Sequence, residues 1–178
     1  MRLPLLLAAC ACLVPAAHAA KGHAHGEGRL DVVIDRNTLS LHLELPLDAA
    51  VGFERPPRSD KEKMALAAAA RLLQEAAMLF QPTPAAGCSV QSAQVQVPFT
   101  GGDDKHGQHA HEGEVHHADI EAGYVFRCDK PAALKDIETT LFRHFKRLYR
   151  LETQRVGLMS QGGQGAQRLT PKNPVLGW

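Results

Sequence analysis

The sequence predicts an α+β fold in a single domain, with a mainly antiparallel β-sheet, one long helix packed on a face and a histidine-rich hairpin loop. Two pairs of segments alternate apolar with polar residues, which is typical of half-buried strands. An alanine- and leucine-rich segment between the two pairs repeats its apolar residues at helical spacing. The 178-residue chain is also long enough to bury one substantial core.

The first strand pair is predicted on the two sides of a turn at Arg36-Asn37. Residues 29–35 and 39–45 each alternate apolar and polar side chains, and a short polar turn between two such segments indicates a β-hairpin. His42 falls on the polar face of the second strand. It is a candidate metal ligand there, although an ordinary strand histidine exposed to solvent would show the same pattern.

The long helix is predicted over residues 59–80. Ser59 and Glu62 have the spacing of a capping box, in which the two side chains satisfy the first free backbone amides of a helix. The segment 81–84 contains two prolines and should end the helix, because proline cannot continue the helical hydrogen-bond pattern.

The second strand pair, residues 88–99 and 116–128, is predicted as the hairpin that carries the histidine-rich loop. The apolar residues of the first arm change parity partway along it. A one-residue bulge near Gln91-Ser92 would restore the match with the second arm. That register places Cys88 beside Cys128. A disulfide is therefore expected, and a pair of thiolates on a metal ion is the alternative.

Shorter elements are predicted after the second hairpin, where the patterns are weaker. They are a short helix from Pro131, a brief strand at 137–141, a helical turn at 142–148, and strands at 151–159 and 167–170.

Residues 1–19 are predicted to be a secretory signal peptide, and residues 20–178 the mature metal-binding domain. Arg2 supplies the positive charge at the start of the leader, and the apolar segment 3–14 is too short to span a bilayer. Ala17-His18-Ala19 fits the small-x-small rule for cleavage.

The predicted destination of the mature chain is the periplasm. Leu7-Ala8-Ala9-Cys10 also resembles a lipoprotein cleavage box, although it lies very early, and lipid attachment is the alternative to release. No other segment is long and apolar enough to cross a membrane, so an integral membrane protein is not expected. The chain has 20 Lys and Arg against 19 Asp and Glu, without a basic stripe, so nucleic acid is not an expected partner.

A cluster of histidines around the loop at residues 100–115 is the main functional signal. Imidazole is the commonest protein ligand for zinc, nickel and copper, and the interleaved carboxylates can complete a coordination shell. We therefore predict binding of a transition metal, with Zn(II) first and Ni(II) or Cu(II) as alternatives. The candidate ligands in and beside the loop are His106, His109, His111, His116 and His117; His23 and His25 form a second pair near the predicted mature start.

The chain is not predicted to be an enzyme. The segment from His111 to Val115 comes near the zinc-protease motif, but Val115 stands where the second histidine must be, and Gly113 weakens the helix that the motif needs. A cysteine nucleophile is not expected either, because Cys88 and Cys128 should be oxidised.

Several short motifs are spread over nearly the whole predicted mature chain. They are His23-Ala24-His25-Gly26 with Leu30-Asp31-Val32, Val51-Gly52-Phe53-Glu54, Ala86-Gly87-Cys88, His117-Ala118-Asp119, Tyr124-Val125-Phe126-Arg127-Cys128, Gln164-Gly165-Ala166 and Leu169-Thr170-Pro171-Lys172-Asn173-Pro174. Together these motifs resemble the ZrgA-like family of periplasmic zinc-binding proteins. Arg55 stands where relatives often carry a histidine.

The resemblance implies a protein that captures zinc and assists its uptake, with an inner-membrane permease and its ATPase as partners. It also implies that His23, His25, His117 and Asp119 are the ordered ligands, while the remaining loop histidines gather metal. Storage or detoxification of excess nickel or copper, with no transporter partner, is the second hypothesis.

Overall fold

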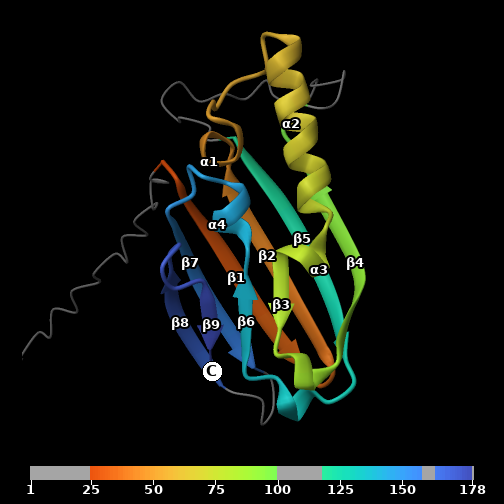
Figure 1. Ribbon diagram of the computed structural model, residues 1–178. Helices are drawn as coiled ribbons and strands as arrows, with labels where there is room; N and C mark the ends of the chain where they lie inside the picture. Colours follow the sequence, from red (N-terminus) through yellow and green to blue (C-terminus); the bar gives the residue numbers. More distant parts are fainter. Residues whose placement is uncertain (1–24, 100–117, 158–162, 178) are drawn as a thin grey trace, which may run out of the picture.

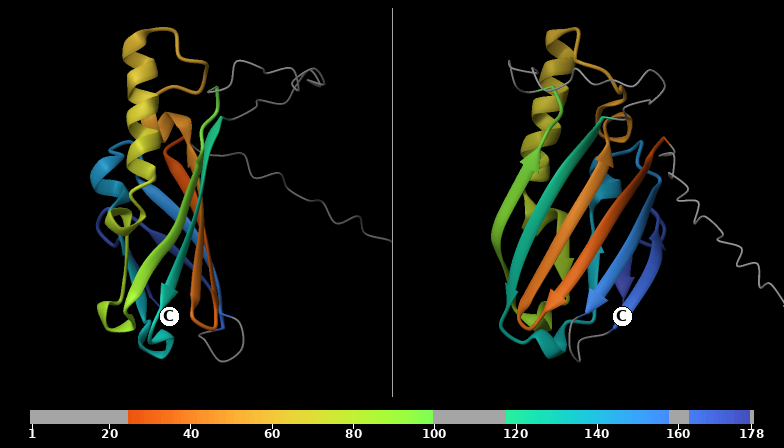
Figure 2. Two further views of the ribbon diagram at one scale, coloured as in Figure 1. Left: turned by 90° about the vertical axis from the view of Figure 1, so that its right-hand side faces the viewer. Right: turned by 180° about the vertical axis from the view of Figure 1, so that it is seen from behind.

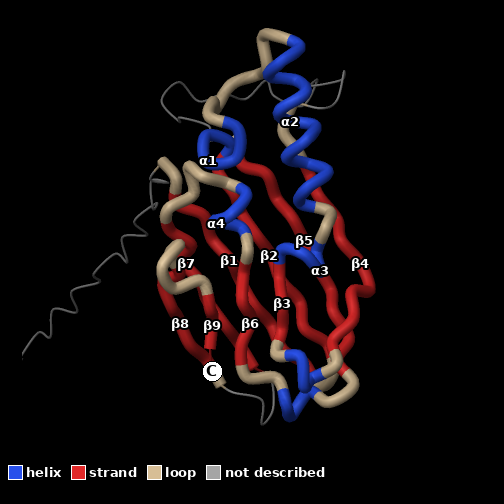
Figure 3. Tube along the Cα trace, in the orientation of Figure 1, coloured by secondary structure: helices blue, strands red, loops and turns tan. Residues whose placement is uncertain are grey.

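The computed structural model describes residues 25–99, 118–157 and 163–177. Of these residues 48% lie in strands and 25% in helical segments, so the protein is mostly β (Figure 3). The predicted α+β class with one long helix is therefore wrong. The part of the chain described here forms two sheets, a six-stranded one and a three-stranded one (Figure 1).

The six-stranded sheet has the order β4-β5-β2-β1-β7-β8. Neighbouring strands are antiparallel except β1 and β7, which are parallel. Both predicted hairpins are confirmed, as β1–β2 and β4–β5. The strands are β1 (Glu27–Asp35), β2 (Thr38–Pro46), β4 (Cys88–Gln96), β5 (Asp119–Cys128), β7 (Arg150–Gly157) and β8 (Gln164–Leu169).

The register of the β4–β5 hairpin confirms the predicted bulge. The pairing shifts between Val90 and Ser92, so that Ala93 lies opposite Tyr124 while Val90 lies opposite Phe126. Cys88 then faces Cys128, and the two form the expected disulfide. The extra residue lets Cys88 on one side of the bulge, and Ala93 and Val95 on the other, pack against the core, whereas Val90 is 37% exposed.

The three-stranded sheet, with the order β3-β6-β9, lies in front of the larger one in the view of Figure 1. Its strands are β3 (Phe80–Pro82), β6 (Asp136–Thr139) and β9 (Val175–Gly177). The sequence pattern predicted a strand near β6 but neither β3 nor β9, because a segment of three residues is too short to show strand alternation.

The helices are short, and only one of those described exceeds two turns. The predicted helix at 59–80 is divided into α2 and α3, with β3 beginning at Phe80. The predicted cap at Ser59 is confirmed, since its hydroxyl accepts a hydrogen bond from the Glu62 amide at 3.2 Å. The helices are α1 (Leu47–Val51), α2 (Asp60–Leu73), α3 (Ala76–Leu79) and α4 (Leu141–His144), with 3-10 turns at Pro84–Ala86 and Pro131–Ala133.

Side chains from distant strands end both halves of the divided helix. The buried Tyr124 hydroxyl donates to the Leu73 carbonyl at 2.8 Å, at the last residue of α2. The Thr139 hydroxyl donates to the Leu79 carbonyl at 3.1 Å, at the end of α3. Carbonyls at a helix end need partners other than helix amides, and these hydroxyls supply them.

The core lies between one face of the six-stranded sheet and a layer made of the helices and the small sheet (Figure 2). Strands β1 and β2 alternate buried and exposed residues along most of their length, so their second face meets solvent. The rings of Phe80 and Tyr124 meet in the core with centroids 5.0 Å apart. Among the described helices, none has the length and apolar character that a membrane span requires.

Candidate metal centre

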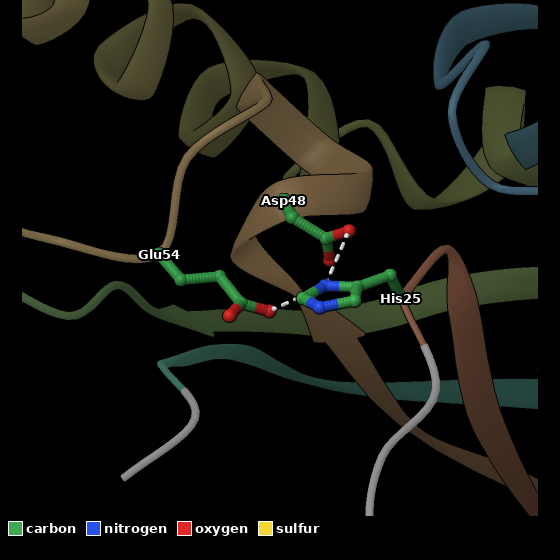
Figure 4. Close-up of side chains that lie close together, drawn as sticks. All are labelled: His25, Asp48 and Glu54. Carbon is green, nitrogen blue, oxygen red and sulfur yellow. Dashed lines mark ion pairs between the residues drawn. The ribbon is translucent and has the colours of Figure 1, made fainter. Parts of the chain in front are cut away.

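Three side chains that could hold a metal ion converge at one end of the six-stranded sheet (Figure 4). His25 precedes β1, Asp48 belongs to α1, and Glu54 follows that helix. His25 Nδ1 lies 3.2 Å from Asp48 Oδ2 and 3.4 Å from Glu54 Oε1. One potential ligand atom from each residue lies within 4.8 Å of the other two.

These separations fit a small tetrahedral ion. Zinc binds imidazole nitrogen and carboxylate oxygen at about 2.0–2.2 Å, so two ligand atoms on one tetrahedron should lie about 3.3–3.6 Å apart. The distances of His25 Nδ1 from Asp48 (3.2 Å) and from Glu54 (3.4 Å) are close to that range. Two carboxylates also balance the charge of a divalent cation. Three protein ligands would leave a fourth position open to water or to a transfer partner.

Asp48 supplies a second observation in favour of a cation. Its Oδ1 atom is buried and accepts no hydrogen bond from the described residues. A buried carboxylate oxygen without a partner costs free energy, and a bound cation would offset that cost. The His25 side chain, by contrast, is 75% exposed, so an ion held here would remain accessible from solvent.

A close backbone contact positions His25. The next residue, Gly26, has φ +74°, and its carbonyl accepts a hydrogen bond from the Tyr149 amide at 3.0 Å. A Cβ atom on Gly26 would lie 2.6 Å from the Arg147 carbonyl oxygen and 2.7 Å from the Tyr149 ring. Only glycine fits this space without a shift. The contact therefore fixes the backbone between His25 and the first residue of β1.

A polar network around Glu27, the residue after Gly26, stabilises the same part of the structure. The Tyr149 hydroxyl donates to Glu27 Oε1 at 2.8 Å, and Arg150 forms an ion pair with the other oxygen of Glu27. Burial opposes ionisation of Glu27, but the hydrogen bonds from Tyr149 and Arg150 prevail and lower its pKa. Glu27 is thus occupied by Arg150 and Tyr149, and it does not belong to the cluster of three ligands.

The short helix α1 places the two carboxylates. Its first amide, Leu47 N, donates to the Ala118 carbonyl at 2.9 Å, which ties the helix to the start of β5. Gly52 ends the helix with φ +90°, and its amide donates to the Asp48 carbonyl. A left-handed residue at this point turns the chain back, so that Glu54 reaches the same site as Asp48.

The segment after Glu54 is anchored to α2. The Arg55 guanidinium makes two hydrogen bonds to the Glu62 carboxylate, at 2.7 and 3.0 Å, and lies 5.4 Å from the centre of the Phe53 ring. The bond from Arg55 is the main reason why the pKa of Glu62 falls to about 2, and a backbone hydrogen bond from Arg58 adds to it. Arg55 therefore serves as an anchor for the chain on which Glu54 lies.

The other predicted ligands are distributed differently. Asp119 begins β5 opposite Pro46, at the same end of the sheet as α1, but it is outside the cluster of three ligands. His42 lies on β2 with its side chain 49% exposed, 3.7 Å from Glu44, and is also outside the cluster. The predicted ligands His23, His106, His109, His111, His116 and His117 lie outside the described residues.

Asp48 and Glu54 were not predicted as ligands. Asp48 lies within the five-residue helix α1 and Glu54 follows it six positions later, and neither spacing nor composition links them to His25. Glu54 stands in one of the motifs that carry the family resemblance, which is the only sequence signal that could have pointed to it.

Comparison with models of protein families gives a match over residues 22–178, to the family described as "ZrgA family zinc uptake protein". The match spans all three residues of the cluster. A search among curated proteins gives no match.

Proposed function

The chain belongs to the ZrgA family of zinc uptake proteins, and from this premise we propose that it captures Zn²⁺ and assists its import by a transporter of the cell envelope. In this proposal the protein binds its cargo and catalyses no reaction. The ordered site consists of His25, Asp48 and Glu54.

The observation that carries the proposal is the geometry of those three residues. Carboxylate oxygens of Asp48 and Glu54 lie 3.2 and 3.4 Å from His25 Nδ1, close to the spacing of ligands on one zinc ion, and the buried Asp48 Oδ1 lacks a hydrogen-bond partner among the described residues. The site has one nitrogen and otherwise oxygen ligands, which suits Zn²⁺ better than the soft ion Cu(I). Its exposure to solvent favours exchange of the ion over permanent structural binding.

The proposed location is the periplasm, with residues 1–19 acting as the signal peptide. The disulfide between Cys88 and Cys128 is compatible with an oxidising compartment. The proposed partners are an inner-membrane permease and its ATPase, to which the loaded protein would deliver the ion.

The histidine-rich loop has a separate proposed role. Its histidines would raise the local concentration of zinc and pass ions to the ordered site, and His23, His117 and Asp119 remain predicted additional ligands. The loop joins β4 to β5, and Ala118, the first described residue after it, is hydrogen-bonded to α1. The described chain that follows the loop therefore begins next to the helix that carries Asp48.

Calorimetric titration of the mature protein with Zn²⁺, Ni²⁺ and Cu²⁺ tests the proposal. We expect Asp48→Asn and Glu54→Gln each to weaken zinc binding at the ordered site by about a hundredfold or more, since even changes around the ligands of metal sites cost about 10–100-fold. Glu121→Gln is the matched control, because Glu121 is an exposed carboxylate on β5 outside the cluster. Deletion of residues 103–115 should remove weak sites and leave the tight one.

Equal zinc binding by wild type, Asp48→Asn and Glu54→Gln would refute the ordered site, and would show that His25 is merely a hydrogen-bonded or ion-paired imidazole. If the loop deletion abolishes all binding, the loop is the binding element. Measurement of transcript levels separates uptake from the alternative of nickel or copper storage: zinc depletion should raise expression, whereas storage predicts induction by excess metal.

A further inference from the structure

A surface groove runs along α1 and α2, beside the candidate metal centre. It consists of two adjoining hollows of about 380 and 340 Å³, which share Val51 and Ala65. The first lies between α1, α2 and the segment 144–147, and the second lies between the end of α1 and the start of α2. We call the two hollows together the α1–α2 groove.

The floor of the groove is apolar and made of small side chains. Alanines of α1 and α2, including Ala49 and Ala68, line the first hollow. Ala65 and Ala68 are exposed, and Met64 beside them is 65% exposed. A helix on the surface of a protein usually directs charged or polar residues toward solvent. The exposed face of α2 is apolar instead, which is typical of a surface that binds another molecule.

The rim of the groove is basic. Among the described residues, Lys146, Arg147 and His144 line the first hollow, and none of its lining residues is acidic. Lys61 lines the second hollow, where the one carboxylate among the described lining residues, Glu62, is already paired with Arg55. Within the described parts of the chain, Lys61, Lys146 and the Arg147 guanidinium make no ion pair. The groove therefore combines an apolar floor with positive charge that no described residue neutralises.

The groove shares a wall with the candidate metal centre. Ala49 and Val51 of α1 line the groove, while Asp48 of the same helix belongs to the ligand cluster. The Arg147 guanidinium lies 3.0 Å from the position that a Cβ on Gly52 would occupy, and Gly52 is two residues before Glu54. A molecule bound in the groove would thus lie one short helix away from the ion.

We propose that the α1–α2 groove docks an acidic segment of the protein that takes over the metal ion. The basic rim selects glutamate and aspartate side chains, and the floor selects small apolar residues between them. Two joined open hollows suit an extended segment of a protein better than one small molecule, which is usually enclosed over most of its surface. The delivery role rests on the proposed function; the docking itself does not.

The test is an NMR titration with a short peptide of alternating glutamate and alanine, and with the corresponding lysine peptide, at low salt. We expect the acidic peptide to shift amide signals of α1, α2 and residues 144–147, and salt to weaken its binding. The double variant Lys61→Glu/Lys146→Glu reverses one charge in each hollow and should weaken this binding about tenfold or more. The control, Lys130→Glu/Lys135→Glu, reverses two exposed charges beside the 3-10 turn at Pro131–Ala133 and should bind as wild type does.

Three results would overturn the proposal: no saturable binding of the acidic peptide, equal binding of the lysine peptide, or no effect of the groove variant. Zinc titrations of the same samples distinguish failure of the docking proposal from failure of the metal-site proposal. The groove variant Lys61→Glu/Lys146→Glu should lose peptide binding and keep zinc binding. Asp48→Asn should lose zinc binding and keep peptide binding.

The same proposal can be tested in living cells with a photo-crosslinking residue at position 68, which lines the groove, and with one at position 135 as the control. An adduct from position 68 alone, mapped to an acidic segment of a membrane transporter component, supports the proposal. Absence of such an adduct, or its mapping to a basic or neutral segment, contradicts it.

Discussion

Replacement of Gly26 by alanine should weaken zinc binding through the position of its neighbour, His25. The added Cβ would lie 2.6 Å from the Arg147 carbonyl oxygen, whereas ordinary contact begins at 3.4 Å. The chain must therefore move by about 0.8 Å, the difference between these two distances. Metal–ligand bonds tolerate deviations of only about 0.2 Å, so His25 should lose its productive position.

We expect two separate effects of Gly26→Ala. Zinc affinity should fall about 10–100-fold, as it does when a residue that orients a ligand is changed. The free energy of unfolding should fall by about 1–2 kcal/mol from the positive φ alone, with a further loss from the contact. Calorimetry measures the first effect, and urea unfolding of the metal-free protein measures the second.

Gly87→Ala is the matched control. Gly87 also has a positive φ, +60°, but a Cβ there would meet only Asp129 at 3.5 Å, an ordinary contact. It should lose stability from φ strain and keep wild-type zinc affinity. The reasoning is refuted if Gly26→Ala binds zinc as tightly as wild type, or if both variants lose affinity in proportion to their loss of stability.

Three further predictions concern the framework of the fold. Tyr124→Phe leaves the buried Leu73 carbonyl without its hydrogen bond and should destabilise the protein by about 1–3 kcal/mol in urea unfolding; an unchanged midpoint would contradict this role. The Glu62 carboxyl should titrate near pH 2 by NMR and move toward its usual pKa of 4.5 in Arg55→Ala. Because its folded pKa is depressed, its stabilising effect is complete above about pH 4.5 and is lost as the pH falls toward 2. Reduction of the β4–β5 disulfide, which closes a loop of 40 residues, should cost about 4 kcal/mol on the chain-entropy model, and unchanged stability would refute that estimate.

The two hairpins could be predicted because their information is local. Apolar alternation defines each strand, and the change of parity near Gln91 and Ser92 could be repaired only by a bulge that also brought the cysteines together. Pattern and covalent chemistry led to one register, which the structure confirms.

The division of the predicted long helix could not be read from its own residues. Its alanine- and leucine-rich sequence favours a continuous helix, but hydroxyl groups 51 and 60 residues away satisfy the carbonyls at which α2 and α3 end. The same limit applies to the parallel pairing of β1 with β7, since the pattern of a strand does not identify its partner.

The candidate metal centre was partly accessible from sequence. His25 was among the predicted ligands because imidazole is a common metal ligand and His25 lies in one of the motifs that carry the family resemblance. Asp48 and Glu54 are ordinary surface carboxylates by sequence, and only the left-handed turn at Gly52 and the hydrogen bond from α1 to β5 bring them to His25.

The disulfide and the candidate metal centre lie at opposite ends of the same strand. Cys128 closes β5 at its far end, whereas the beginning of β5 supports the helix that carries Asp48. The disulfide thus stabilises the fold whether or not a metal ion is bound, unlike a zinc finger, which unfolds when a chelator removes its zinc. Removal of a bound ion should therefore leave the fold intact, so that binding and release need not pass through an unfolded intermediate.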